Sequence, residues 1–217
     1  MMRAANPTAA LAGVPSGVQA QGLWIGRRQL FVRFAAEAET ATMYTADALA
    51  NELVRSAGRS VYHSISVSGR DPLANADFLL AAFEKGPAPV PVMVDCDGTR
   101  PETVVAIAPH IALVQVTLDG VVPDAVLDRV MMTLKMAGSA GVEHALVLAP
   151  QEKMTDGQLL RVIEQARAAS DQTMIVIHPP MNVAEQDRRW LMLMERASGV
   201  HRDTRLLVRL PPPTGMR

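Results

Sequence analysis

The sequence predicts an α/β protein in which parallel strands alternate with helices. Short apolar and β-branched runs alternate with amphipathic stretches along most of the chain, and turn or capping residues stand between them. This rhythm requires parallel strands joined by right-handed crossovers. Because six or seven such units are too few for a complete eight-stranded barrel, we expect a partial (βα)6-type TIM barrel. A flat doubly wound sheet is the alternative.

Each expected element rests on a local pattern. The first strand reads QLFVRF, the second alternates polar and apolar residues, and the later ones are short apolar runs. The first helix has apolar residues at Ala48, Leu49, Leu53 and Val54 and is closed by Gly58. A later helix has Thr155 as N-cap with Gln158 placed for a capping box. The expected strands are 29–34, 60–67, 91–94, 112–116, 145–148, 174–177 and 206–210, and the expected helices are 45–57, 75–85, 100–106, 123–137, 155–169 and 183–197.

The composition fits one globular domain. A chain of 217 residues, about half of them hydrophobic, can bury one sizeable core, so we expect a single domain over 1–217 with 1–17 as a flexible or irregular segment. The net charge of −1 gives no reason to expect nucleic acid or an acidic membrane surface as a partner. No apolar run approaches the ~18 residues of a membrane span, and the N-terminus lacks the apolar core of a signal peptide, so we expect a cytoplasmic protein.

The cysteine content excludes several kinds of site. Cys96 stands alone, so the chain has no intrachain disulfide and no cysteine-based zinc site. One thiolate is also too few for a protein-held iron–sulfur cluster. We therefore expect no metal and no cofactor. Cys96 is interpreted as a small inert thiol, although its place beside a strand end also allows a reactive one.

Several polar residues follow the carboxyl ends of the expected strands, where ligands of such folds bind. Asp95, Asp97, Asp119 and His178 all fall there and could converge as a hard-metal or acid–base site. The alternative is that Asp, Gly and Pro serve these loops as caps and turn formers. Three further histidines lie near or within expected strands and are interpreted as structural: His63, His110 and His144.

Four segments together resemble one enzyme family. They are 19–34 (QAQGLWIGRRQLFVRF), 68–80 (SGRDPLANADFLL), 94–99 (VDCDGT) and 207–213 (LVRLPPP). In this order and at similar spacing, they resemble the 7-carboxy-7-deazaguanine synthases, which are radical-SAM enzymes. The resemblance covers nearly the whole chain and implies the partial barrel of that family. It also implies a SAM-binding turn at Ser68, Gly69, Arg70 and Asp71, and mouth residues at Gln19 and Gln21.

The departures from the family pattern concern its chemistry. Where the family carries three cluster cysteines, residues 35–44 read AAEAETATMY, and Glu37 and Glu39 are hard ligands that replace thiolate poorly. The Gly-Gly-Glu of the turn has become Gly69-Arg70-Asp71, in which Arg70 would repel a cationic ligand, so we interpret the turn as vestigial. The family's opening motif is Gln-Gly-Glu-Gly. The corresponding residues here are Gln19-Ala20-Gln21-Gly22, which lack its acid. Three elements of one chemistry are missing together, which indicates a degenerate enzyme without its own cluster.

A degenerate enzyme has to act in another way. The resemblance favours a structural or regulatory subunit, either a homo-oligomer or one with a heteromeric protein partner. The runs 130–136 (VMMTLKM) and 190–194 (WLMLM) are more apolar than one buried helix face needs, so both ordinary packing and a partner surface remain open. One alternative is an enzyme or binding protein with a purine- or pterin-like ligand at the mouth. Another is a radical-SAM enzyme completed by a partner chain.

Overall fold

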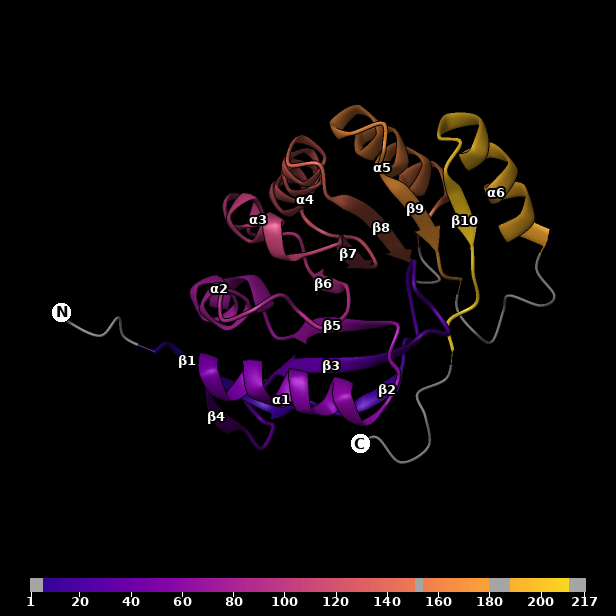
Figure 1. Cartoon of the computed structure of the whole chain (residues 1–217). Coiled ribbons are helices and arrows are strands. Elements are labelled where there is room, and N and C mark those ends of the chain that lie inside the picture. Colours follow the sequence, from indigo (N-terminus) through magenta and orange to yellow (C-terminus); the bar gives the residue numbers. More distant parts are fainter. Residues whose placement is uncertain (1–5, 151–153, 180–187, 211–217) are drawn as a thin grey trace.

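Seven parallel strands make up most of the sheet in the computed structural model, which describes residues 6–150, 154–179 and 188–210. The row is curved and its two ends do not meet within these residues, so the barrel is not closed (Figure 1). The expectation of an α/β fold with a largely parallel sheet is confirmed. In spatial order the strands are β3 (Arg28–Phe34), β5 (Ser64–Gly69), β6 (Val92–Cys96), β7 (Leu113–Asp119), β8 (Glu143–Ala149), β9 (Met174–Ile177) and β10 (Thr204–Leu206).

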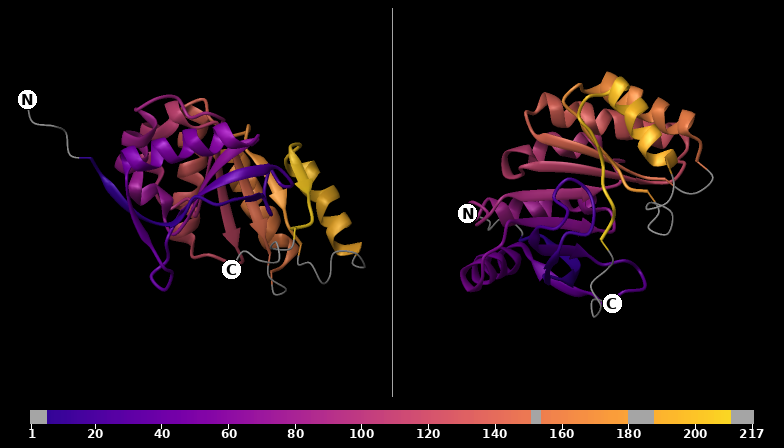
Figure 2. Two further views of the ribbon diagram at one scale, coloured as in Figure 1. Left: turned by 60° about the horizontal axis from the view of Figure 1, so that its bottom comes forward. Right: turned by 90° about the vertical axis from the view of Figure 1, so that its right-hand side faces the viewer.

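Helices cover the outer face of this sheet, as Figure 2 shows from two further sides. Each helix buries one apolar face against the strands, for example Leu49 and Leu53 of α1. Short 3-10 turns at Pro72–Asn75 and Ala108–His110 complete the connections. The helices are α1 (Ala46–Arg59), α2 (Ala76–Phe83), α3 (Pro101–Ile107), α4 (Asp124–Ser139), α5 (Asp156–Ala169) and α6 (Arg188–Val200).

An antiparallel extension on the β3 side was not expected. It consists of β1 (Thr8–Gly13) and β4 (Thr42–Thr45), which pair with each other, and of β2 (Ser16–Val18), which pairs with β3. The interpretation of 1–17 as flexible or irregular is therefore wrong for the part that forms β1 and β2. These short strands carry weak alternation of their own, and pairing with β3 decides their conformation. That residues 1–217 form one domain stays a prediction.

The element boundaries follow the local sequence signals closely in most places. The capping box is confirmed, because Thr155 Oγ1 accepts from Gln158 N at 3.2 Å and Gln158 Oε1 accepts from Thr155 N at 2.8 Å. The second expected strand begins later, at Ser64, and the last one is displaced toward the N-terminus, since β10 ends at Leu206. The expected start of the last helix, within 183–187, lies outside the described residues.

The inner face of the sheet has a cover of its own. Residues 19–27, which join β2 to β3 and are called the inner loop below, pass across the concave side of the strands. Leu23 and Trp24 of this loop pack against Met93, Leu113 and Ala145, which are fully buried on β6, β7 and β8. The inner loop thus replaces the water that would otherwise contact the apolar inner face.

The two Met-rich runs lie mostly against the core. In α4, Met131 and Met136 pack on buried residues, whereas Met132 is 42% exposed. In α6, Leu193 is buried and Met192 is 61% exposed. Helix α5 contacts both α4 and α6 and lies between them, so the exposed parts of the two runs do not form one surface. Among the described residues no helix is long and apolar enough to cross a bilayer.

The neighbouring positions Met192 and Leu193 provide a matched test of this packing. Leu193→Glu buries an unpaired carboxylate and should unfold the protein, because that burial costs several kcal/mol. Met192→Glu places the same charge on the exposed side of α6 and should change the free energy of unfolding by no more than about 0.5 kcal/mol. Urea denaturation followed by circular dichroism measures both. Equal destabilisation by the two substitutions would contradict this placement of α6.

Candidate functional site

An open cleft of about 670 Å³ lies at the carboxyl ends of β5, β6 and β7, beside the inner loop. It brings together the residues predicted for the turn and for the mouth, with the exception of His178. Parallel strands explain this convergence, because their carboxyl ends share one edge of the sheet. The lining residues are Gln19, Ala20, Gln21, Ser68, Gly69, Arg70, Asp71, Asp95, Cys96, Asp97, Thr117 and Asp119.

Asp95 provides the acid at the base of the cleft. Its Oδ1 accepts a hydrogen bond from Thr117 Oγ1 at 2.9 Å, and its Oδ2 accepts one from Gln21 Nε2 at 3.3 Å. Burial raises the pKa of Asp95, and the hydrogen bonds from Thr117 and Gln21, with the charge of Arg209, oppose that shift only in part. A carboxyl group in this state can accept or donate a hydrogen bond toward the cleft.

The two glutamines of the inner loop differ in how well their amides are satisfied. Gln19 is only 5% exposed, its Oε1 accepts from Ala20 N at 3.1 Å, and its Nε2 has no hydrogen-bond partner. Leaving such a buried donor unpaired costs about 1–3 kcal/mol. The Oε1 of Gln21, by contrast, accepts a hydrogen bond from Arg209 Nη2. Gln19 therefore lines the cleft with an amide whose buried donor is unused.

The turn at 68–71 is held in place by ion pairs. Asp71 binds Arg100 in a bidentate pair, with Nε–Oδ1 at 2.8 Å and Nη2–Oδ2 at 2.6 Å, and the Arg100 hydrogen bond is the main reason that the pKa of Asp71 is lowered. Arg70 pairs with Glu37 at 2.5 Å. Gly69 has φ +99°, and a Cβ there would lie 2.2 Å from Phe34 O, so the backbone requires glycine.

The remaining acids of the mouth have local roles. Asp97 Oδ1 accepts from Thr99 N at 2.9 Å and from Thr99 Oγ1 at 2.7 Å, so it caps its own turn. Asp119 is exposed and lies 3.9 Å from Arg209. In the described part of the chain, no three His, Cys, Asp or Glu side chains are placed to share a metal ion. Whether these acids and His178 form a hard-metal or acid–base site stays a prediction.

His178 does not line the cleft, which corrects its assignment to the mouth. It follows β9, is 3% exposed, and lies behind the inner loop. Its Nε2 accepts a hydrogen bond from Gly22 N at 2.7 Å, and its Nδ1 lies 2.7 Å from Leu207 O. His144 also has a structural role, because its ring contacts Val142 O at 2.9 Å and Ser170 Oγ at 2.8 Å.

The loop that would carry cluster cysteines has a different construction. It joins β3 to β4, and Glu39 accepts from Arg33 Nη2 at 2.9 Å and from Ala36 N at 3.1 Å. Cys96 is 6% exposed on β6, and burial raises its pKa to about 12. Carboxylates held in ion pairs together with one buried thiol do not fit an iron–sulfur cluster, which needs several thiolates.

Three residues of the site were missed in the sequence: Arg100, Thr117 and Arg209. Thr117 lies two residues before Asp119, so its place at a strand end could have identified it. Arg209 was placed inside an expected strand, and its role depends on the end of β10 lying farther back, at Leu206. No local sequence pattern could have identified Arg100, because its partner Asp71 is 29 positions away.

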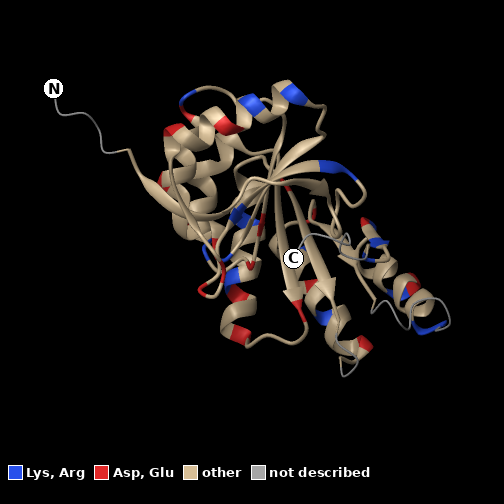
Figure 3. Cartoon of the chain, turned by 90° about the horizontal axis from the view of Figure 1, so that it is seen from below, with Lys and Arg blue, Asp and Glu red and all other residues tan. Residues whose placement is uncertain are grey.

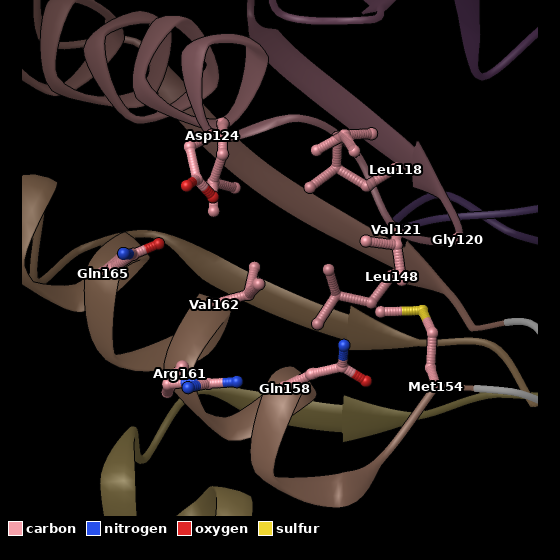
Figure 4. A pocket seen from close by; sticks show the side chains of 12 residues that line it. Leu118, Gly120, Val121, Asp124, Leu148, Met154, Gln158, Arg161, Val162 and Gln165 are labelled. Atoms are coloured by element: carbon pink, nitrogen blue, oxygen red, sulfur yellow. The ribbon is translucent and has the colours of Figure 1, made fainter.

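A second hollow of about 310 Å³ lies between α4 and α5, outside the sheet (Figure 4). Apolar side chains such as Leu118, Leu148 and Met154 form its floor, while Asp124 and Arg161 stand at its edges. No residue predicted for the mouth lines it. Charged residues of both signs are interspersed on the view in Figure 3, and neither sign forms a broad area there.

Comparison with known proteins gives one distant relation. The sequence matches no family model. It is 30% identical over 107 residues to 7-carboxy-7-deazaguanine synthase of Methanothermobacter thermautotrophicus, an alignment that covers 43% of this chain and 42% of that protein. The chain thus spans about two fifths of the length of the curated relative that it matches.

The solved structures with a similar arrangement are more remote in sequence. A candidate dihydrodipicolinate synthetase from Pseudomonas aeruginosa aligns at a TM-score of 0.40 with 13% identity, over 75% of this chain and 49% of its own. The 3-keto-D-glucoside 4-epimerase of E. coli aligns at a TM-score of 0.41 with 14% identity, over 75% of this chain and 76% of its own.

The burial of Cys96 predicts slow thiol chemistry. At pH 8 the folded protein should react with a disulfide reagent such as DTNB at least about 100-fold more slowly than the same chain in guanidinium chloride, because reaction needs an exposed thiolate. Absorbance of the released thiolate measures the rate. The denatured chain is the control, since it carries the same single cysteine. Rapid stoichiometric labelling of the folded protein would contradict the inert interpretation.

Proposed function

We propose that this protein is a degenerate relative of the 7-carboxy-7-deazaguanine synthases that binds a small polar heterocycle in the cleft and forms no cluster of its own. The observation that carries the proposal is the buried, unpartnered Nε2 of Gln19 in the cleft that also contains Asp95. A ligand carbonyl would satisfy the amide donor, and Asp95 could accept or donate to a ring nitrogen. A purine- or pterin-like edge offers both groups.

The loss of cluster chemistry is supported by what now occupies the mouth. Glu37 and Glu39, in the loop after β3, pair with Arg70 and Arg33, and the first of these pairs fixes Arg70, a residue that distinguishes this chain from the family pattern. Arg70 lines the cleft at the turn that resembles a SAM-binding turn. A cationic sulfonium ligand would meet a positive charge there. The distant relation supports common ancestry with the synthases and leaves their activity open.

A structural or regulatory subunit is the second candidate function. Leu191 and Met192 support it, because these adjacent apolar side chains on α6 are 63% and 61% exposed. A homo-oligomer or a heteromeric partner that covers them would dissociate when Met192 is replaced by Glu. The two functions are compatible, since α6 covers the outer face of the sheet while the cleft opens at the ends of the strands.

The chain by itself should form no cluster and bind SAM poorly. Anaerobic reconstitution with iron and sulfide should give no absorbance band near ~400 nm and no stoichiometric iron, because the sequence offers a single thiolate. Calorimetry should show no SAM binding tighter than about 1 mM, which corresponds to about 4 kcal/mol. A reproducible content of four irons, or micromolar SAM affinity, would contradict the proposed degeneracy.

Binding in the cleft can be tested with pterin-6-carboxylate and guanine as probes. We expect at least one of them to bind with a dissociation constant below about 100 μM. Gln19→Met keeps the length of the side chain but removes its donor, and should weaken binding at least about tenfold, or about 1.4 kcal/mol. Gln165→Met on α5 is the matched control and should bind as the wild type does. Equal affinities in the wild type and Gln19→Met would exclude Gln19 from the site.

A further inference from the structure

The inner loop is fixed to the sheet by hydrogen bonds from its backbone. Gly22 N donates to His178 Nε2 at 2.7 Å, and Leu23 N donates to Gln115 Oε1 at 3.0 Å. Ala20 O accepts from Leu210 N at 2.9 Å. Gly22 has φ +77°, and a Cβ there would collide with the side chain of Gln115, so the backbone of the loop lies directly against this side chain of β7.

The partners of His178 determine its protonation state. Leu207 O can only accept, so the proton must be on Nδ1, at a distance of 2.7 Å. Nε2 must then carry a lone pair, because it accepts the hydrogen bond of Gly22 N. Both ring nitrogens are thus used by the backbone, and the ring is 3% exposed. His178 connects the inner loop to the chain that follows β10 through a neutral imidazole.

A proton on Nε2 would oppose this arrangement. The added N–H would point at the N–H of Gly22, so two donors would face each other in a buried place. The charged group that faces His178 from the segment after β10 is Arg209, which is positive. The inner loop contributes neutral groups beside the ring, and β8 contributes the carbonyl of Leu148, which accepts from His178 N at 2.8 Å. Asp119 of β7 lies near Arg209 rather than against the ring.

We infer that His178 is a positioning residue that holds Gln19 and Gln21 in the cleft through its hydrogen bond to Gly22, and that protonation of its ring releases the inner loop. The role of the released glutamines rests on the proposed function, whereas the movement of the loop does not. Mild acid therefore lowers affinity in the cleft through a residue that does not itself line it. The loop rejoins the sheet when the proton is lost.

The direction of the pH dependence follows from the surroundings of the ring. Burial lowers the pKa of His178 below its ordinary value of 6.5, the hydrogen bond to Leu207 O opposes this, and the charge of Arg209 lowers it further. The neutral ring therefore stabilises the loop fully above about pH 6.5. That stabilisation is lost as the pH falls through the lowered pKa of the folded state.

Trp24 in the inner loop reports the release directly. In a Trp190→Phe background Trp24 is the remaining tryptophan, and its emission should shift to longer wavelength as the pH is lowered from 7.5 to 5. His178→Gln should abolish the shift, because its Oε1 can accept from Gly22 N and does not titrate. His178→Asn retains a donor for Leu207 O but does not reach Gly22, so it should show the shifted emission at pH 7.5 as well. A residue that only fills space would tolerate Gln and Asn alike.

His63 requires a control, because its ring lies 5.0 Å from that of Trp24 and its pKa is also lowered by burial. His63→Gln should leave the emission transition in place. A transition that survives His178→Gln, or that disappears with His63→Gln, overturns the inference.

If the Asn variant does not fold, amide exchange of the wild type decides. The Gly22 amide should lose protection below the transition while that of Val116 in β7 keeps it, and equal behaviour of the two amides overturns the inference. Neither readout requires a ligand, so its failure is separate from that of the proposed function.

Discussion

An open sheet of parallel strands has an inner face that no helix covers, and covering this face is the constraint on which the rest of the structure depends. Met93, Leu113 and Ala145 are fully buried although they point away from the helices. Leu23 and Trp24 provide the cover. Without them the apolar inner face would contact water, at about 25 cal/mol for each Å² exposed. The inner loop is therefore a part of the core that lies on the side opposite to the helices.

The position of the inner loop also shapes the cleft. The loop can approach β7 only because Gly22 has no side chain, and its backbone donors need partners there, which His178 and Gln115 provide. Gln19 and Gln21 enter the cleft as a consequence of this packing. The packing of the inner face and the lining of the cleft thus share one short segment, so a change that moves the loop changes both.

The charges around the cleft bear on the proposed loss of cluster chemistry. Ion pairs use Glu37, Glu39 and Asp71, all of which lie in or near the places where the family pattern carries cluster or SAM groups. Hard carboxylates in such pairs do not bind iron and sulfide as thiolates do. Asp95 and the amide of Gln19 are outside these pairs, and they give the cleft its remaining capacity for hydrogen bonds.

The sequence by itself determined the α/β class, most element boundaries, the capping box at Thr155 and the gathering of the turn and mouth residues at one edge. These features depend on local periodicity and on the rule that parallel strands end at the same side. The lack of cluster thiolates was also readable, because it is a matter of composition. The tertiary structure alone decided that β1, β2 and β4 form, that Asp71 pairs with Arg100, and that His178 supports the inner loop instead of lining the cleft. Each of these depends on contacts between distant parts of the chain, such as the 156 positions between Gly22 and His178, which no local pattern encodes.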